Sequence, residues 1–198
     1  FEFQKIYQLF NKHLALVVWT SSSNLICQVY SKLPVFFIGY FFGSQLLGQY
    51  ELAYGAIYLP IGILLSSVND IFKAKISNEI DRIGNCKKTF RSFLEILSKF
   101  SIFILFPFLL IFPYLFGFIF GNQWSEGGYL IRIMSLLICS NFVANPLSYV
   151  LIICRKQKID FLWQIAMLLG TIISFQIPSL LKLFFDVRMS LFFYSFVS

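Results

Sequence analysis

A small set of polar side chains lies inside the apolar runs of this chain. The set comprises two cations and four amides: Lys32, Arg132, Gln28, Asn141, Asn145 and Gln164. A lysine at the centre of a bilayer costs roughly 2.5–3.5 kcal/mol on insertion scales, so it persists where it faces a wet cavity or a partner. Lys32 is therefore a candidate cation of a polar cavity that meets an anionic ligand. The alternative is a snorkelling or ion-paired lysine.

Three tyrosines form a second pattern. Tyr50, Tyr54 and Tyr58 recur at a spacing of four residues, which places their rings on one face of a helix. Rings on one face can stack against sugars, but they also pack helices together and form aromatic belts at membrane interfaces. We expect packing and an interfacial position, with sugar stacking as the alternative.

The other reactive residues form no catalytic or metal-binding pattern. His13 has no partner at metal-ligand spacing, and the four cysteines are far apart: Cys27, Cys86, Cys139 and Cys154. We expect a surface histidine and small buried cysteines. No Gly-x-x-x-x-Gly-Lys-Ser/Thr run is present, and no Ser–His or His–acid arrangement is available. The sequence therefore predicts no metal, no cofactor and no enzymatic activity.

The composition places these residues in a membrane. Hydrophobic residues make up 58% of the 198 residues and charged residues only 13%, against about 25% charged in soluble domains. The mean hydropathy is +0.77. The formal net charge of +7 is explained by basic loops of a membrane protein, so it does not indicate nucleic-acid binding.

Apolar runs of about 20 residues each are long enough to cross a hydrocarbon core of about 30 Å. The predicted spans are about 21–43, 52–72, 93–120, 129–154 and 161–181, with a truncated sixth from near 189. The predicted fold is an all-α, polytopic transmembrane helical bundle, one membrane domain over residues 1–198. The connections are expected to be an amphipathic segment over 1–13, a cap at 21–24, turns at 44–50 and 121–128, and a solvated, partly amphipathic loop over 73–91. Because the chain starts at Phe1 and ends in an apolar run, we expect a fragment cut at both ends.

Every complete predicted span contains a proline. The candidate kink positions are Pro34, Pro60, Pro107, Pro146 and Pro178, with Pro113 a second proline in the third span. Proline removes a backbone hydrogen bond and bends a helix, which membrane helices tolerate when neighbours satisfy the freed carbonyl. Bent helices around a polar interior are typical of transporters that alternate their access.

Lysine and arginine predict the orientation. Lys5, Lys12 and the basic stretches 73–91 and 155–158 fall on one side of the predicted membrane, and Lys182 and Arg188 on the other. The positive-inside rule therefore places the N-terminus and both basic loops in the cytosol.

Two stretches carry a resemblance to a known family. In the first, a Gly-x-Tyr-x-Leu-Ala turn precedes a helix with a mid-span Leu-Pro and a basic end: Gly48, Tyr50, Leu52, Ala53, Leu59, Pro60, Lys75 and Ser77. In the second, Phe-Gly-x-x-Trp precedes Asn-Pro-Leu and a basic loop: Phe120, Gly121, Trp124, Asn145, Pro146, Leu147 and Lys158. Together with Leu33-Pro34, they resemble polysaccharide exporters of the multidrug/oligosaccharidyl-lipid/polysaccharide superfamily, over nearly the whole chain.

This resemblance implies a function and a larger architecture. The chain would be the C-terminal half of a two-bundle transporter like the multidrug exporters. It would flip an undecaprenyl-pyrophosphate-linked oligosaccharide across the bacterial inner membrane, for O-antigen, lipopolysaccharide or capsule synthesis. Its partners would be that lipid-linked sugar, membrane lipid and the N-terminal half. Lys32 and then Arg132 are the candidate pyrophosphate cations, and the four amides are candidates for sugar hydroxyls.

Other functions stay open at this point. The motifs separate the polysaccharide flippases poorly from lipid II flippase-like relatives. A multidrug or cation antiporter of the same superfamily is another alternative, but an antiporter needs an intramembrane carboxylate. Glu51 and Glu126 are predicted at outer turns and Asp70 and Glu95 at the cytosolic edge. A membrane-embedded polysaccharide polymerase or acyltransferase would need a catalytic group and a larger loop or cavity.

Overall fold

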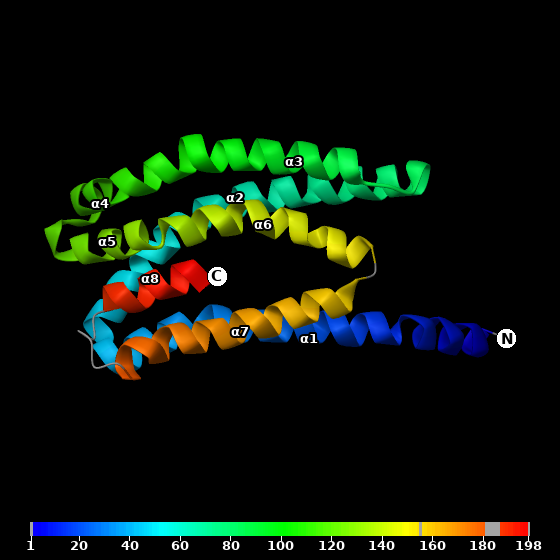
Figure 1. The fold of residues 1–198 in the computed structure, drawn as a ribbon, viewed down its shortest axis with the longest axis horizontal. Coiled ribbons are helices and arrows are strands. Elements are labelled where there is room, and N and C mark those ends of the chain that lie inside the picture. Colours follow the sequence, from blue (N-terminus) through cyan, green and yellow to red (C-terminus); the bar gives the residue numbers. More distant parts are fainter. Residues whose placement is uncertain (1, 155, 181–186, 198) are drawn as a thin grey trace.

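The computed structural model describes residues 2–154, 156–180 and 187–197, and nearly all of them are helical (Figure 1). No β-strand occurs in these ranges. The helices are α1 (Glu2–Phe42), α2 (Ser44–Ile83), α3 (Lys87–Phe100), α4 (Phe106–Phe120), α5 (Ser125–Ile133), α6 (Ser135–Ile153), α7 (Gln157–Leu180) and α8 (Val187–Val197). A π-helical turn, η1 (Ser101–Leu105), joins α3 to α4, and a 3-10 turn, η2 (Asn122–Trp124), precedes α5.

Within the described residues, five helical segments are long and apolar enough to cross a membrane. They are Val18–Phe42, Ser44–Ile83, Lys87–Phe120, Ser135–Ile153 and Gln157–Gln176. Large apolar side chains such as Phe36, Leu59 and Phe118 point outward and are exposed, as expected where lipid surrounds the bundle. The predicted fold class, an all-α membrane bundle, is confirmed.

Glycines with positive φ angles set the helix ends. Gly43 (φ 87°), Gly84 (φ 71°) and Gly121 (φ 94°) adopt conformations that a Cβ disfavours. The Gly84 amide donates to the Ile80 carbonyl at 2.8 Å and closes α2. The predicted turn over 44–50 is wrong, because the chain turns at Gly43 and α2 begins at the next residue.

Other predicted connections are also shorter in the structure. α1 runs without a break from Glu2 through the predicted amphipathic segment and the predicted cap at 21–24, since residues 2–33 contain neither glycine nor proline. Residues 73–91 are mostly helical, with a connection of only 84–86. The predicted outer turn over 121–128 is helical from Ser125 onward. Polar composition predicted loops here, but polar residues are equally compatible with helix ends that reach beyond the membrane.

Prolines lie inside the helices as predicted. Pro34, Pro60, Pro113 and Pro146 occupy helix interiors, and the side chain of Pro178 in α7 is outside the described side chains. Pro107 is the second residue of α4, one turn after the centre of η1. Its missing N–H and its ring conflict with the carbonyl four residues earlier, and the wider π turn accommodates that conflict. Kinks at all of these prolines stay a prediction.

Two adjacent glycines allow α5 to sit close to α2 and α4. A Cβ on Gly127 would collide with the Gln49 carbonyl of α2, and one on Gly128 would lie 2.7 Å from the Pro113 Cα of α4. The Gln49 side chain also donates to the Gln123 carbonyl at 3.1 Å. These contacts build the main buried cluster, which includes Phe116 and Leu130.

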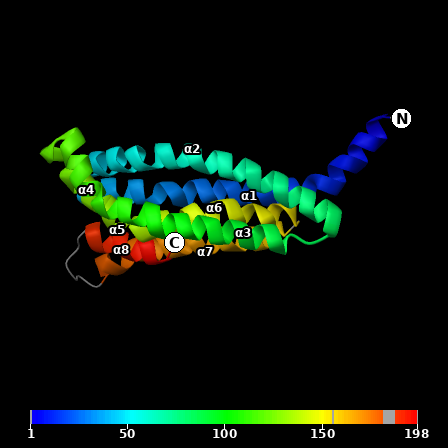
Figure 2. The same ribbon diagram turned by 90° about the horizontal axis from the view of Figure 1, so that it is seen from above.

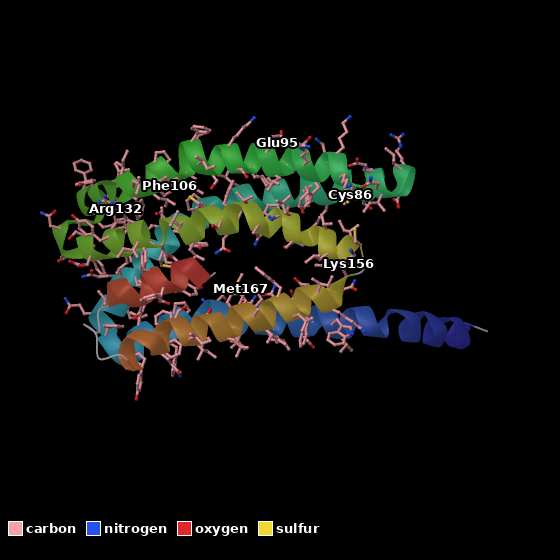
Figure 3. All side chains as sticks on the ribbon, viewed as in Figure 1. Cys86, Glu95, Phe106, Arg132, Lys156 and Met167 are labelled. Carbon is pink, nitrogen blue, oxygen red and sulfur yellow. The ribbon has the colours of Figure 1, made fainter. Side chains whose placement is uncertain are left out.

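The connections place the basic stretches together. Figure 1 shows the N-terminus, the α2–α3 connection and the α6–α7 connection at one end of the bundle. Figure 2 shows the first turns of α1 extending beyond the other helices at that end. Figure 3 places Cys86 and Lys156 there and Arg132 near the opposite end. The predicted common side of the two basic loops is thus reproduced by the chain path, without fixing which side faces the cytosol.

Candidate functional site

A polar, aromatic cavity lies between α1, α2, α6, α7 and α8, and we call it the tyrosine cleft. Its volume is about 300 Å³. Its lining includes Tyr30 and Ser31 of α1, Tyr50, Tyr54 and Tyr58 of α2, Ser140, Asn141, Ala144 and Asn145 of α6, Trp163 and Met167 of α7, and Tyr194 of α8. Aromatic rings with amides beside them can stack on a sugar ring and hydrogen-bond its hydroxyls.

The tyrosines of α2 form a ladder along one wall. The ring centroids of Tyr50 and Tyr54 are 5.5 Å apart, and those of Tyr54 and Tyr58 are 3.9 Å apart and stacked at 18°. Tyr50 is buried, whereas Tyr54 and Tyr58 are half-buried and present part of their surface to the cleft. Tyr58 and Asn141 line the same cavity from α2 and α6. The spacing predicted packing, and the structure adds that the same rings line a cavity.

The two asparagines of α6 are held from α2. Asn69 donates from Nδ2 to Asn145 Oδ1 at 3.3 Å. The Asn69 Oδ1 atom is buried and accepts no hydrogen bond from the described residues. The hydrogen bond from Asn69 therefore orients the Asn145 amide, and the Asn69 Oδ1 atom retains unused hydrogen-bonding capacity.

Lys32 lines a second pocket that adjoins the cleft. This pocket has a volume of about 290 Å³ and shares Ser31, Tyr50 and Tyr54 with the cleft. Lys32 is exposed and makes no ion pair with the described residues. Glu51 lines the same pocket. Sequence reasoning placed Glu51 at an outer turn, but α2 begins at Ser44, so this carboxylate lies inside the helix.

Three predicted site residues lie elsewhere. Arg132 is exposed on α5 and lines neither pocket (Figure 3). Gln28 is exposed one turn before Lys32 and is outside both lining sets. Gln164 follows Trp163 on α7 without lining the cleft, and its buried Oε1 accepts no hydrogen bond from the described residues. The structure therefore groups Lys32, Asn141 and Asn145, and leaves these three outside.

Sequence reasoning missed the aromatic residues that close the cleft. Tyr30, Trp163 and Tyr194 come from three different helices, and no spacing in the sequence brings them together. The tyrosine ladder was visible as a four-residue repeat, but its exposure to a cavity depends on where α6 and α7 pack.

The cysteines are less buried than expected. Cys27, Cys86 and Cys139 are half-buried, whereas Cys154 is exposed, so the prediction of four buried cysteines is wrong. At the basic end, partial burial and then the neighbouring Cys154 thiol raise the pKa of Cys86. No cluster of three or more potential metal ligands occurs in the described part of the chain.

Comparison with known proteins identifies the family. Residues 2–127 match the family described as polysaccharide biosynthesis protein. The chain belongs to this family. It is also 24% identical over 153 residues to the teichuronic acid biosynthesis protein TuaB of Bacillus subtilis, and the match covers 75% of this chain and 31% of TuaB. No solved structure matches the chain at a significant level.

The chain is thus a member of the polysaccharide biosynthesis family whose helices are long and apolar enough to cross a membrane. The family match contains Lys32 and the whole tyrosine ladder, whereas Asn141 and Asn145 follow it in the chain. The chain spans about a third of the length of TuaB.

Proposed function

We propose that this chain is part of a transporter that moves a lipid-linked oligosaccharide, an undecaprenyl-pyrophosphate-linked repeat unit, across the bacterial inner membrane by alternating access. The observation that carries the proposal is the tyrosine cleft. It is a polar cavity in an otherwise apolar bundle, in a chain of a polysaccharide biosynthesis family. A sugar that is transported across the bilayer needs such a polar cavity, because its hydroxyl groups are costly to place in hydrocarbon.

The cleft offers two kinds of contact to a glycan. Tyr54 and Tyr58 present ring surface for stacking, and Asn141 and Asn145 present amide groups for hydroxyls. Stacking tolerates many sugars because it uses ring faces, whereas the amides depend on where hydroxyls point. A site of this kind favours carbohydrates as a class and leaves room for the repeat unit to vary.

Lys32 is the proposed partner of the pyrophosphate. It lies beside the cleft in the adjoining pocket and makes no ion pair with the described residues. A pyrophosphate entering low-dielectric surroundings loses hydration, and a nearby ammonium offsets part of that cost. Arg132 would act in a different position, since it is exposed on α5 away from both pockets.

The orientation and the assembly belong to the same proposal. The basic end, with the 73–91 and 155–158 stretches, would face the cytosol. The chain would be the C-terminal half of the transporter, with the N-terminal bundle completing the cavity, membrane lipid surrounding it and no enzymatic step. Alternating access would then rock one bundle against the other.

A cation antiporter is a second candidate because of one observation. Glu51 lines the Lys32 pocket within α2, and a carboxylate inside a span is what ion coupling requires. A Glu51→Gln variant that loses export of toxic cations, while surface glycan is normal, would favour this candidate.

Complementation tests the proposed function. The intact gene is expressed in a bacterium that lacks its own O-antigen flippase, and surface glycan is measured. We expect glycan to return. The proposed substrate is wrong if two results occur together. No glycan returns in strains lacking the O-antigen or teichuronic acid transporter, although the protein is present in the membrane, and a strain lacking lipid II flippase or a multidrug exporter is rescued.

A further inference from the structure

A larger cavity lies on the other side of α6 from the tyrosine cleft, and we call it the outer groove. It has a volume of about 630 Å³ between α6 and the rod formed by α3, η1 and α4. Leu94 and Ser98 of α3, Ser101 and Ile102 of η1, Phe106 of α4, and Leu136, Cys139, Ser140, Val143, Ala144 and Leu147 of α6 line it. Figure 1 shows α6 between α3 and α7, and Figure 3 places Phe106 and Met167 on its two sides.

The lining of the outer groove suits hydrocarbon. It contains no charged residue. The Ser101 hydroxyl donates to the Cys139 carbonyl at 3.1 Å, and the Cys139 thiol donates to the Ser101 carbonyl at 3.8 Å. This reciprocal pair satisfies polar groups between η1 and α6, so the groove surface there offers van der Waals contact.

The π turn contributes to the shape of the groove. Ser101 and Ile102 belong to η1, where the backbone bonds from the Phe106 amide to the Ser101 carbonyl, five residues back. A π turn widens the helix and displaces the side chains on either side of it, and such turns recur at functional sites. The groove therefore lies where the α3–α4 rod departs from regular geometry.

Two small residues connect the outer groove with the tyrosine cleft. Ser140 and Ala144 line both cavities. They are four residues apart, on one edge of α6, and both are exposed. Asn141 and Asn145 follow them directly and line only the cleft. The two small residues thus lie between the amides of the cleft and the apolar lining of the outer groove.

We propose that the outer groove binds the hydrocarbon chain of the lipid-linked substrate while its polar head occupies the tyrosine cleft, the molecule crossing α6 at Ser140 and Ala144. This inference rests on the proposed function. Bulk phospholipid would also fill an apolar groove, but the shared lining with a polar cleft fits one molecule that is polar at one end and apolar at the other.

Photocrosslinking of the intact protein in nanodiscs tests the site. The probe is undecaprenyl pyrophosphate, without sugar, that carries a diazirine in its chain. We expect label in peptides containing 94–106 and 136–147. Leu94→Trp fills the groove, and Ile96→Trp is the matched control, since Ile96 is exposed on the same helix but does not line the groove.

The two variants should differ in how strongly these peptides are labelled. Leu94→Trp should lower the labelling of these peptides about tenfold. This corresponds to roughly one or two methylene groups of the probe chain that are no longer buried in the groove. Ile96→Trp should leave it unchanged. Equal labelling in both variants, or equally strong labelling by a diazirine phosphatidylglycerol that the polyprenyl probe does not displace, overturns the inference, because the groove then holds bulk lipid.

The same experiment separates this inference from the proposed function. Labelling that depends on Leu94, combined with failed complementation, would keep the chain-binding groove and reject oligosaccharide transport. Successful complementation with no difference between Leu94→Trp and Ile96→Trp, in labelling and in glycan export, would keep transport and reject the groove.

Discussion

At the scale of single residues, the account depends on how polar groups are distributed around α6 and α2. The amides Asn141 and Asn145 were predicted from their chemistry inside an apolar run, and they line the tyrosine cleft. The amides Gln28 and Gln164 and the cation Arg132 were predicted in the same way and do not line it. Residue type alone selects candidates, but the direction in which a helix face points is fixed by packing, which the sequence does not display.

Lys32 carries the prediction about charge. Lys32→Ala should lower glycan export about tenfold to a hundredfold, the loss expected from a charge-assisted contact. Lys32→Arg should retain most of the export, and Lys32→Gln should resemble alanine, because charge is the property used. Surface glycan is measured at matched protein levels in the membrane. Unchanged export in Lys32→Ala would show that the cation has no part in transport.

The tyrosine ladder carries the prediction about stacking. Tyr58→Leu should lower export about two- to tenfold, since an aromatic contact contributes roughly 0.5–1.5 kcal/mol. Tyr114→Leu is the matched control, because Tyr114 is 68% exposed on α4 and outside the cleft. An equal effect in the two variants would mean that Tyr58 has only a packing role.

At the scale of elements, glycines and prolines determined more of the structure than polar composition did. Gly43, Gly84 and Gly121 mark helix ends, whereas the polar stretch 73–91 is largely helical. The number and order of the spans could be predicted from apolar runs, because length and hydropathy decide them. Helix ends could not, since helix propensity in a polar segment is nearly indifferent between helix and loop.

The close approach of α5 and α2 gives a stability prediction. Gly127→Ala should lower the free energy of unfolding of the detergent-solubilised protein by about 1–3 kcal/mol, because the added Cβ collides with the Gln49 backbone. The effect is measured by thermal unfolding. Gly62→Ala is the control, since a Cβ there meets nothing within 4 Å. A loss in Gly62→Ala as large as that in Gly127→Ala would contradict the packing described here.

The connections at the basic end give a labelling prediction. A membrane-impermeant maleimide should modify neither Cys86 nor Cys154 from outside intact cells, and should modify them in inverted vesicles. Because partial burial raises the pKa of Cys86, less of its thiol is ionised at neutral pH, so its labelling should accelerate as the pH rises above the ordinary thiol range. Labelling of Cys154 in intact cells would reverse the proposed orientation.

At the scale of the whole molecule, one end of the bundle is basic. A polar cleft lies between its helices, and an apolar groove lies on the other side of α6 from that cleft. This arrangement fits the substrate that we propose for this chain, a molecule with a sugar head and a lipid tail. The sequence predicted the bundle and part of the cleft. It did not predict the groove, because that depends on the π turn and on how α6 lies against α3.

Leaflet exchange in a purified system shows whether the protein moves a lipid-linked oligosaccharide. The intact protein is reconstituted in liposomes with a fluorescent polyprenyl-pyrophosphate oligosaccharide, and the fraction accessible to a quencher on one side is followed over time. We expect protein-dependent exchange between leaflets that Asn141→Ala slows and Tyr114→Leu does not. Exchange that is no faster than in empty liposomes, although correctly folded protein is inserted in both orientations, would contradict the proposed transport.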